Sequence, residues 1–279
     1  MATSIARDKN LNFTLDSLTE AGFGTQYHKV VQDGYKSGKS EIELKPFIVP
    51  LAENAGVRFQ PKVTEGNDQG RYNFNGYLAT LYVEGKAPKE QFFGSYMMTG
   101  INIDQAKIAL TGGTVLHTDW DKNEKTRKQV FSRIDFDLAV DPGENHRIVR
   151  VNAKNIDLTR LLSQEDIYMR QADKEKLIAK IQTGEIYDVR IRETIDGKEK
   201  LTPVSLRLHL ADEKTMQMVV MNMEGKVLRL PEVKAVEASQ IKSIGVILSD
   251  ATAGVLPEGL LKMMQNHEAE QKTAKGLRA

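Results

Sequence analysis

Short segments with a two-residue alternation of apolar and polar side chains constrain the fold of this chain more than any other feature. A first block of such segments covers residues 40–49, 57–64, 71–84 and 91–99, and a second covers 185–194, 201–211, 215–223 and 226–230. Each block leads into a stretch with helical spacing, at 102–110 and at 238–248. Alternation over four to eight residues between turn-forming residues indicates strands. Runs of antiparallel strands followed by helices predict an α+β fold.

The region between the two blocks fits this order less well. It contains strand-like segments at 114–120, 131–140 and 147–152, and Asp157 is placed to cap a helical stretch that extends to about Gln182. We therefore expect one α+β domain over 25–255, with a first block at about 39–112, an inserted middle region at about 113–183 and a second block at about 184–250. Residues 1–24 would form an N-terminal extension, and 256–279 a C-terminal helix with a polar tail.

Composition and charge exclude several classes of protein. The 39 Lys and Arg residues nearly balance the 38 Asp and Glu residues, so any basic binding face must be local. The absence of cysteine excludes disulfides, thiolate zinc sites and cysteine nucleophiles. The first residues, MATSIARDKNLNF, lack the apolar segment of a signal peptide, and no stretch approaches the 18 apolar residues of a membrane span. We expect a cytoplasmic protein without a membrane partner.

The stretch from Asp33 to Phe47, DGYKSGKSEIELKPF, comes close to the phosphate-binding P-loop GxxxxGK[ST]. Only three residues separate Gly34 from Gly38, whereas the motif requires four. A P-loop also follows a strand and opens a helix, but here a helix-like stretch at 25–35 precedes and a two-residue alternation follows. The stretch is therefore interpreted as a polar helix-to-strand turn that carries a Lys-Gly-Lys cluster.

No other motif indicates catalysis or a cofactor. His117, Asp119 and Asp121 would share one face of a strand and could approach a metal ion, but no further ligand accompanies them. The polar face of an edge strand explains them more simply. The sequence contains no GxSxG, and no GxGxxG after a strand. We expect a non-catalytic protein with no cofactor and no metal.

Aromatic residues gather in the first block together with basic ones. Seven of the 18 aromatic residues lie between Tyr72 and Tyr96, and only Tyr168 and Tyr187 lie beyond Phe136. Single-stranded nucleic acids are bound by positive grooves in which bases stack on aromatic rings, although aromatic residues in strands most often pack in the core. In an unbroken strand, Tyr72 and Phe74 would share one face and Tyr77 the other. The candidate interface consists of Tyr35, Lys36, Lys39, Lys45, Phe47, Arg58, Lys62, Arg71, Tyr72 and Phe74.

The residues Tyr35-Lys36-Ser37-Gly38-Lys39-Ser40-Glu41 resemble, in loosened form, a motif of the Whirly domain. Whirly domains open their first long strand with Lys-Gly-Lys-Ala-Ala-Leu after a Tyr. In this chain Ser37 is inserted, and Ser40 and Glu41 stand where the alanines would be. The likeness covers about 25–110 and the later block of strands.

The resemblance implies a fold of two blocks, each with four antiparallel strands and a helix. It also implies binding of single strands, because Whirly domains occur in plant single-stranded DNA-binding proteins and kinetoplastid guide-RNA-binding proteins. Plant members tetramerise through the motif that is altered here, so a homo-oligomer is left open. A more distant resemblance is to the nucleus-associated RNA-binding protein of jumbo bacteriophages, which is similar to Whirly domains.

The sequence thus predicts a protein that binds single-stranded RNA, in preference to DNA, with little sequence specificity. Lys and Arg side chains on strands would neutralise phosphates while exposed aromatic rings stack bases. The alternative is a structural or assembly protein, such as a virion component or scaffold, without nucleic-acid binding. Near-neutral charge, many strands and a polar C-terminal tail suit that alternative as well.

Overall fold

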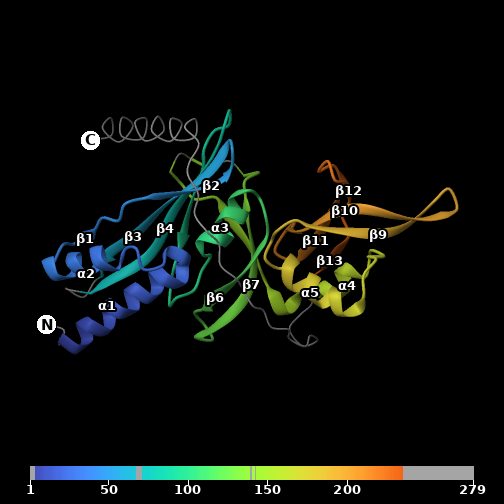
Figure 1. Cartoon of the computed structure of the whole chain (residues 1–279). Helices are drawn as coiled ribbons and strands as arrows, with labels where there is room; N and C mark the ends of the chain where they lie inside the picture. Colours follow the sequence, from blue (N-terminus) through green and yellow to red (C-terminus); the bar gives the residue numbers. More distant parts are fainter. Residues whose placement is uncertain (1–3, 67–70, 139, 142, 235–279) are drawn as a thin grey trace. The chain divides into compact units, whose positions relative to one another are not determined.

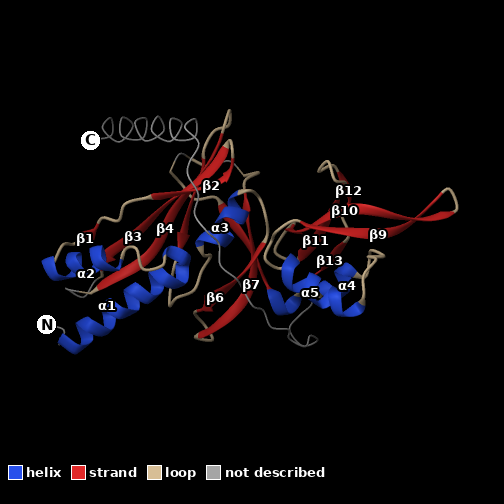
Figure 2. Cartoon of the chain, in the orientation of Figure 1, coloured by secondary structure: helices blue, strands red, loops and turns tan. Residues whose placement is uncertain are grey.

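The computed structural model describes residues 4–66, 71–138, 140, 141 and 143–234. Among these residues the chain forms two compact units. Unit 1 consists of residues 4–66 and 71–110 together with 141 and 143–145, and unit 2 consists of residues 111–138, 140 and 146–234. Each unit combines antiparallel sheets with a few helices, so the predicted α+β class is confirmed (Figure 2).

Unit 1 contains one five-stranded antiparallel sheet, sheet 1, with helices around it (Figure 1). The strand order is β1-β3-β4-β5, and β2 also pairs with β3. The helices are α1 (Ser4–Leu18), which continues into a π-helical turn at Thr19–Phe23, α2 (His28–Ser37) and α3 (Ile103–Leu110). The strands are β1 (Glu41–Ile42), β2 (Phe47–Ala52), β3 (Ala55–Glu65), β4 (Tyr72–Val83) and β5 (Lys89–Gly94).

Helix α1 is an integral part of unit 1. The Asn10 side chain exchanges two hydrogen bonds with the backbone of Tyr72, at 2.8 and 2.9 Å, and the Thr14 hydroxyl donates to the same carbonyl at 2.8 Å. After α1, the ring of Phe23 packs against Phe74 and Tyr77, with ring centroids 5.9 and 5.3 Å apart. Residues 4–23, expected to be an extension, therefore close the aromatic core over one face of sheet 1.

A β-bulge in β4 changes which face the aromatic residues occupy. The register between β3 and β4 shifts at Lys62/Val63, so that Lys62 pairs with Gly76 and Val63 with Phe74. Gly76 has a φ of 126°, and Asn75 is the extra residue. The bulge brings Tyr77 to the same face as Phe74, where both rings contact Phe23. The prediction that Tyr77 faces the other side was wrong, because it assumed an unbroken strand.

The predicted strand at 40–49 is broken in the structure. Strand β1 ends at Ile42 and β2 begins at Phe47, and both pair with β3. Pro46, which lacks a backbone N–H, lies in the interval between them. The predicted helix at 102–110 is confirmed as α3. The backbone N–H of Gln105 donates to the Asn102 side chain and that of Asn102 donates to the Gln105 side chain, which forms a capping box.

Unit 2 builds one hydrophobic core between two antiparallel sheets and two helices. Sheet 2 has the order β6-β7-β8, and sheet 3 the order β12-β11-β10-β9 with β13 also paired to β11. Sheet 2 consists of β6 (Val115–Asp121), β7 (Thr126–Asp135) and β8 (Arg147–Asn152), followed by a 3-10 turn (Ala153–Asn155), α4 (Leu158–Leu162) and α5 (Gln171–Ile181). Sheet 3 consists of β9 (Tyr187–Ile195), β10 (Lys198–Leu210), β11 (Thr215–Met221), β12 (Val227–Arg229) and β13 (Glu232–Lys234).

The stretch at about 113–183, expected to be an insertion, supplies half of this core. Phe131 and Val149 of sheet 2, Leu161 of α4 and Leu177 of α5 are buried in one cluster with Leu206 of β10. The side chain of Asp157 accepts a hydrogen bond from the Arg160 N–H at 2.9 Å, as expected for a helix cap, but the helix ends at Leu162 instead of continuing to Gln182.

The hairpin between β9 and β10 has the predicted two-residue turn. Asp196 and Gly197 have φ angles of 53° and 75°, the positive values that such a turn requires, and Ile195 pairs with Lys198. The two strands continue as a long ribbon beyond the rest of sheet 3 (Figure 1). The predicted helices at 238–248 and 256–279 lie outside the described residues. None of the helices within the described ranges is long and apolar enough to cross a membrane.

Candidate nucleic-acid interface

The Lys-Gly-Lys cluster lies where α2 turns into β1. Helix α2 ends at Ser37, and Gly38 adopts a left-handed conformation with φ 65° and ψ 30°, a common way for a helix to end. Gly34 in the last turns of α2 lies so close to Ile42 that a Cβ atom there would be 2.7 Å from Ile42 Cγ1. The observed order of helix, turn and strand confirms that the stretch is not a P-loop, which requires the reverse order.

Two buried tyrosines hold the backbone of this region from inside. The hydroxyl of Tyr72 donates a hydrogen bond to the carbonyl of Lys39, and the hydroxyl of Tyr27 donates one to the carbonyl of Lys45. The rings of Tyr35 and Tyr72 pack with centroids 5.0 Å apart. The lysine-bearing segment is thus attached to the aromatic core and does not depend on its own short strand alone.

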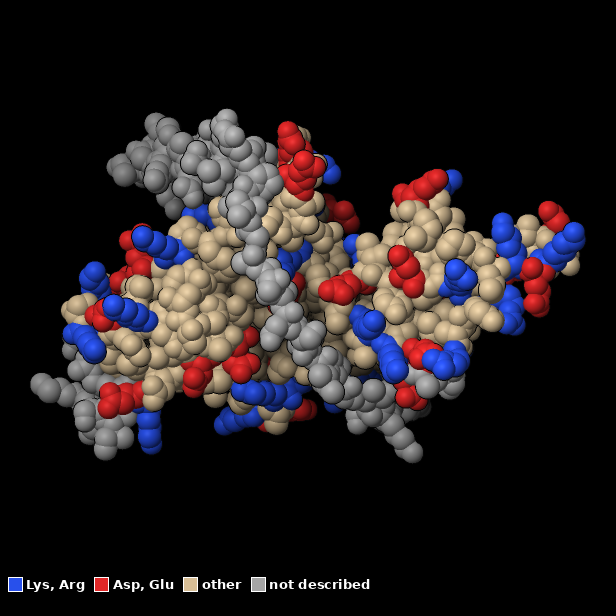
Figure 3. Space-filling view, in the orientation of Figure 1, with Lys and Arg blue, Asp and Glu red and all other residues tan. Residues whose placement is uncertain are grey.

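Four lysine side chains from this region are exposed to solvent. Lys36, Lys39 and Lys45 flank β1, and Lys62 lies on β3 two residues from Thr64, the partner of Glu41 in β1. None of the four forms an ion pair with a residue that the structure describes. Several Lys and Arg side chains lie around the end of unit 1 that carries α2 and β1 (Figure 3). Within the described ranges, no carboxylate pairs with these ammonium groups, which suits contact with a polyanion.

The aromatic part of the predicted interface is corrected by the structure. Tyr35, Tyr72 and Phe74 are buried at the centre of unit 1. Phe47 is half-buried and stacks on Phe59, with ring centroids 5.4 Å apart and an interplanar angle of 29°. These packed rings stabilise the fold, and the three buried ones are not exposed for a base to stack on.

The two predicted arginines occupy different places. Arg71 precedes β4, and its carbonyl accepts a hydrogen bond from the Gly66 N–H at 2.7 Å, close to the end of β3. Arg58 lies four residues before Lys62 on β3, about 13 Å along the strand, and pairs with Thr80. Both arginines have interaction partners within the protein. The structure therefore brings together Lys39, Lys62 and Arg71, and leaves Arg58 apart from them.

The neighbourhood of the lysines is polar as well as basic. Glu41 and Glu43 are exposed between Lys39 and Lys45, and they reduce the local positive charge. Asn73 pairs with Thr64, and the Asn75 side chain donates to the Thr64 hydroxyl at 2.6 Å. Lys62 and Thr64 alternate with the buried Val63, so the lysine shares its face of the sheet with these amides and the hydroxyl.

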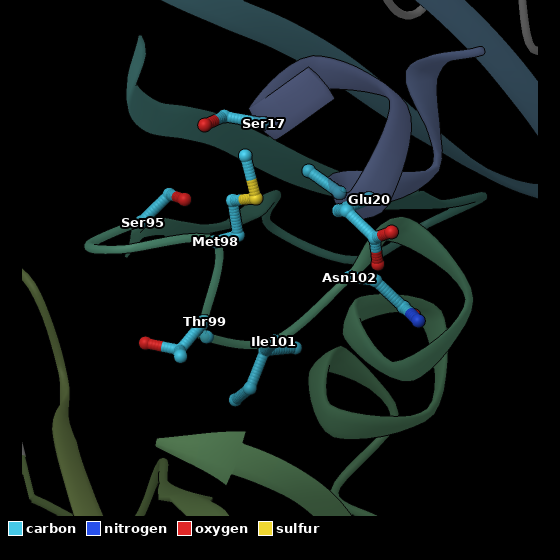
Figure 4. Close-up of a pocket in the computed structure, with 9 residues that line it drawn as sticks. Ser17, Glu20, Ser95, Met98, Thr99, Ile101 and Asn102 are labelled. Carbon is cyan, nitrogen blue, oxygen red and sulfur yellow. The ribbon is translucent and has the colours of Figure 1, made fainter. Parts of the chain in front are cut away.

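Cavities and metal-ligand clusters give no evidence of catalysis in the described residues. A cavity between the end of α1 and the loop after β5, lined by Ser17, Glu20 and Met98 among others, has a volume of about 30 Å³, room for about one water molecule (Figure 4). His117 is buried and lies 2.8 Å from the Ser132 hydroxyl through Nε2, whereas Asp121 accepts a hydrogen bond from Lys128. No group of three or more His, Asp or Glu residues in the described ranges could hold a metal ion.

Sequence reasoning missed one exposed aromatic residue beside basic groups. Tyr168 in unit 2 is 56% exposed, and the Arg192 guanidinium lies 5.6 Å from the centroid of its ring. The isolated position of Tyr168 in a region otherwise rich in aliphatic residues was the available signal. Comparisons with models of protein families, with curated proteins and with solved structures gave no match.

Proposed function

We propose that this protein binds single-stranded nucleic acid, RNA in preference to DNA, without catalysis and with little sequence specificity. The observation that carries the proposal is the set of four exposed lysines, Lys36, Lys39, Lys45 and Lys62, of which Lys39 and Lys45 have backbone carbonyls held by buried tyrosines. A fold related to the Whirly domain and a cytoplasmic location are part of the same proposal. Sheet 1 followed by α3 agrees with the first strand-and-helix block of that domain.

The lysines account for affinity, and the burial of Tyr35, Tyr72 and Phe74 accounts for low specificity at this site. Phosphate contacts release counterions and are made equally with every sequence. Because Tyr35, Tyr72 and Phe74 are buried, this site has no described ring among the predicted residues on which a base could stack fully. Binding should therefore be dominated by the backbone and strongly dependent on salt. The acidic Glu41 and Glu43 keep the affinity moderate, since like charges repel phosphates.

The preference for RNA is supported by the polar groups next to Lys62. Asn73, Asn75 and Thr64 share that region of sheet 1, and amide and hydroxyl groups can pair with a 2′-hydroxyl as donor or acceptor. A deoxyribose offers no such partner, so the same strand as DNA would bind through its phosphates alone.

Fluorescence anisotropy with labelled RNA and DNA of one sequence, across a salt series, tests this proposal. We expect saturable binding by the full chain that weakens linearly in log affinity against log salt, with RNA bound more tightly than DNA. Substituting Lys36, Lys39, Lys45 and Lys62 together by Gln should abolish most of the dependence of the affinity on salt. Absent binding at low salt, or binding that salt does not weaken, would overturn the proposal.

A structural or assembly role is the second candidate, and an apolar surface on sheet 3 favours it. Met223, Val227, Leu228 and Leu230 are all exposed along and beside β12. Exposed apolar groups of this kind are typical of protein contacts. Light scattering of the purified chain across a concentration series distinguishes the candidates. An assembly role is supported if the wild-type protein self-associates, the L228S/L230S variant does not, and the wild-type protein binds no RNA.

A further inference from the structure

The segment after α4 attaches to the outer edge of β9 as a short extra strand. The Tyr168 N–H donates to the Arg190 carbonyl at 2.8 Å, and the Arg192 N–H donates to the Asp166 carbonyl at 2.8 Å. Between them, Ile167 pairs with Ile191, and both side chains are buried. Because side chains alternate along a strand, this pairing points Tyr168 away from the core together with Arg190 and Arg192.

The ring of Tyr168 is therefore presented at the surface by a fixed backbone. Tyr168 is 56% exposed, and the Arg192 guanidinium lies 5.6 Å from the centroid of its ring. Arg190 lies two residues before Arg192 on β9 and is exposed. It forms no ion pair with a described residue. Arg192 has only a distant carboxylate, with its Nη1 atom 4.0 Å from Asp166 Oδ2. The Arg192 guanidinium thus lies next to the exposed aromatic ring, and Arg190 is exposed on the same face of β9.

A hollow lies beside this ring on the β9–β10 ribbon. It has a volume of about 180 Å³ and is lined by Tyr168, Arg192, Glu199, Lys200 and Leu201. Leu201 pairs with Arg192 across the ribbon, so an apolar side chain borders the hollow opposite the ring. Pockets for drug-sized ligands measure about 300–1,000 Å³, so this hollow suits a single planar ring system. Lys and Arg side chains are visible along the ribbon in Figure 3, mixed with Asp and Glu.

We infer that Tyr168 and Arg192 form a stacking site for one base of a single-stranded nucleic acid, with Arg190, which shares their face of β9, placed to meet its phosphates. The site lies in unit 2, so it is additional to the lysines of unit 1, and the inference rests on the proposed function. Aromatic rings and guanidinium planes both stack on bases, and arginines adjacent to the ring neutralise the backbone. This site provides the stacking that the buried tyrosines of unit 1 cannot.

The ring is held in position before any ligand arrives. Glu165, three residues before Tyr168, accepts two hydrogen bonds from Arg229, at 3.0 and 2.8 Å, while Arg229 also donates to Glu193 of β9 at 2.8 Å. The segment is thus tied to β12 and β9 by a charged network in addition to the backbone pairing. A ring fixed in its bound position loses little conformational entropy on binding.

The test compares Tyr168→Leu and Tyr168→Phe in the full chain, with labelled oligouridine and oligoadenosine RNA as probes. Stacking requires the ring but not the hydroxyl, so Y168F should bind as the wild type does and Y168L should bind about fivefold or more weakly. Tyr96→Leu is the matched control, because Tyr96 is 59% exposed in unit 1. Y96L should leave affinity unchanged. Photo-crosslinking with 4-thiouridine RNA should label Tyr168 or its neighbours, identified by mass spectrometry.

The outcomes separate this inference from the proposed function. Salt-dependent RNA binding with equal affinities for Y168L and wild type, and no crosslink near Tyr168, would overturn the stacking site and leave the lysine interface intact. A loss in Y168F as large as in Y168L would also overturn it, because the ring would then not be the binding group. If wild-type protein binds no RNA at all, both proposals are overturned.

Discussion

The hydroxyl of Tyr72 donates a hydrogen bond to the main-chain carbonyl of Lys39, although the Tyr72 ring is fully buried and the Lys39 side chain is exposed. One bond therefore connects the aromatic core of unit 1 to the turn on which the proposed phosphate contacts depend. The tyrosine that the sequence indicated as a base-stacking residue instead positions the backbone of a lysine. In the proposed function, Tyr72 would therefore act indirectly, by positioning this backbone.

Tyr72→Phe should therefore reduce stability more than affinity. The variant keeps the packed ring and loses one hydrogen bond, so we expect the free energy of unfolding to fall by roughly 1 kcal/mol. Urea denaturation measures this change. Tyr187→Phe is the control, because the Tyr187 hydroxyl makes no hydrogen bond to a described residue. Equal stability of Y72F and wild type would show that the bond to Lys39 contributes nothing net.

Removing lysines should change the salt dependence in proportion to the number removed. Each phosphate contact with a single strand contributes about 0.7 to the slope of log affinity against log salt. The double variant K39Q/K62Q should therefore lose about 1.4 from that slope. Lys86→Gln is the control, because Lys86 is equally exposed but lies in the turn after β4, far along that strand from Gly76, the partner of Lys62. A slope unchanged in K39Q/K62Q, or reduced as much in K86Q, contradicts the assignment.

Local signals were sufficient to predict some elements of the fold. The turn at Asp196-Gly197 requires positive φ angles that these residue types tolerate, and the start of α3 is capped by Asn102 and Gln105 close to it in sequence. The Lys-Gly-Lys turn belongs to the same group, since the change from helical to alternating period is visible in the sequence. In each case the residues that determine the structure are only a few positions apart.

Other features depend on partners far away in the chain. Helix α1 has no amphipathic pattern of its own and is held by the bonds of Asn10 and Thr14 to Tyr72, about sixty residues away. The faces of β4 depend on the bulge opposite Lys62 and Val63 of β3. The exposure of Tyr168 follows from the single pairing of Ile167 with Ile191. None of these contacts leaves a local pattern, which is why rings that the sequence placed in a candidate interface are buried in the structure.

Arg229→Gln should destabilise unit 2, because it leaves the Glu165 carboxylate without its partner. The Glu165 side chain is only 8% exposed, so an unpaired charge there is poorly solvated. We expect a loss of about 1–3 kcal/mol in the free energy of unfolding. Arg170→Gln is a control, since Arg170 pairs with Asp173 at an exposed position. An R229Q protein as stable as R170Q would show that the network does not contribute to folding.

The same network should be visible in the pH dependence of stability. The neighbouring Thr202 hydroxyl and the hydrogen bond from Arg229 hold the pKa of Glu193 below its usual 4.5. Since the folded-state pKa is the lower one, this stabilisation is fully present above about pH 4.5 and is lost as the pH falls through the lowered pKa. Urea titrations between pH 7 and 3 should show that the free energy of unfolding falls less on acidification in E193Q than in the wild type. The same fall in the free energy of unfolding on acidification in both proteins would contradict the prediction.

Gly76 and Gly94 are register partners in sheet 1, yet alanine should destabilise the protein at Gly76 and not at Gly94. Gly76 has a φ of 126°, and a Cβ atom there would lie 2.1 Å from the carbonyl oxygen of Phe93, so G76A must distort the bulge. We expect a loss of about 2 kcal/mol or more, from strained backbone together with the clash. A Cβ atom at Gly94 would meet nothing within 4 Å, so G94A should be neutral or slightly stabilising. Urea denaturation of both variants checks this.

Because the bulge places Tyr77 beside Phe74, the near-ultraviolet circular dichroism spectrum should change in G76A and not in G94A. Equal behaviour of the two variants would contradict the assigned register.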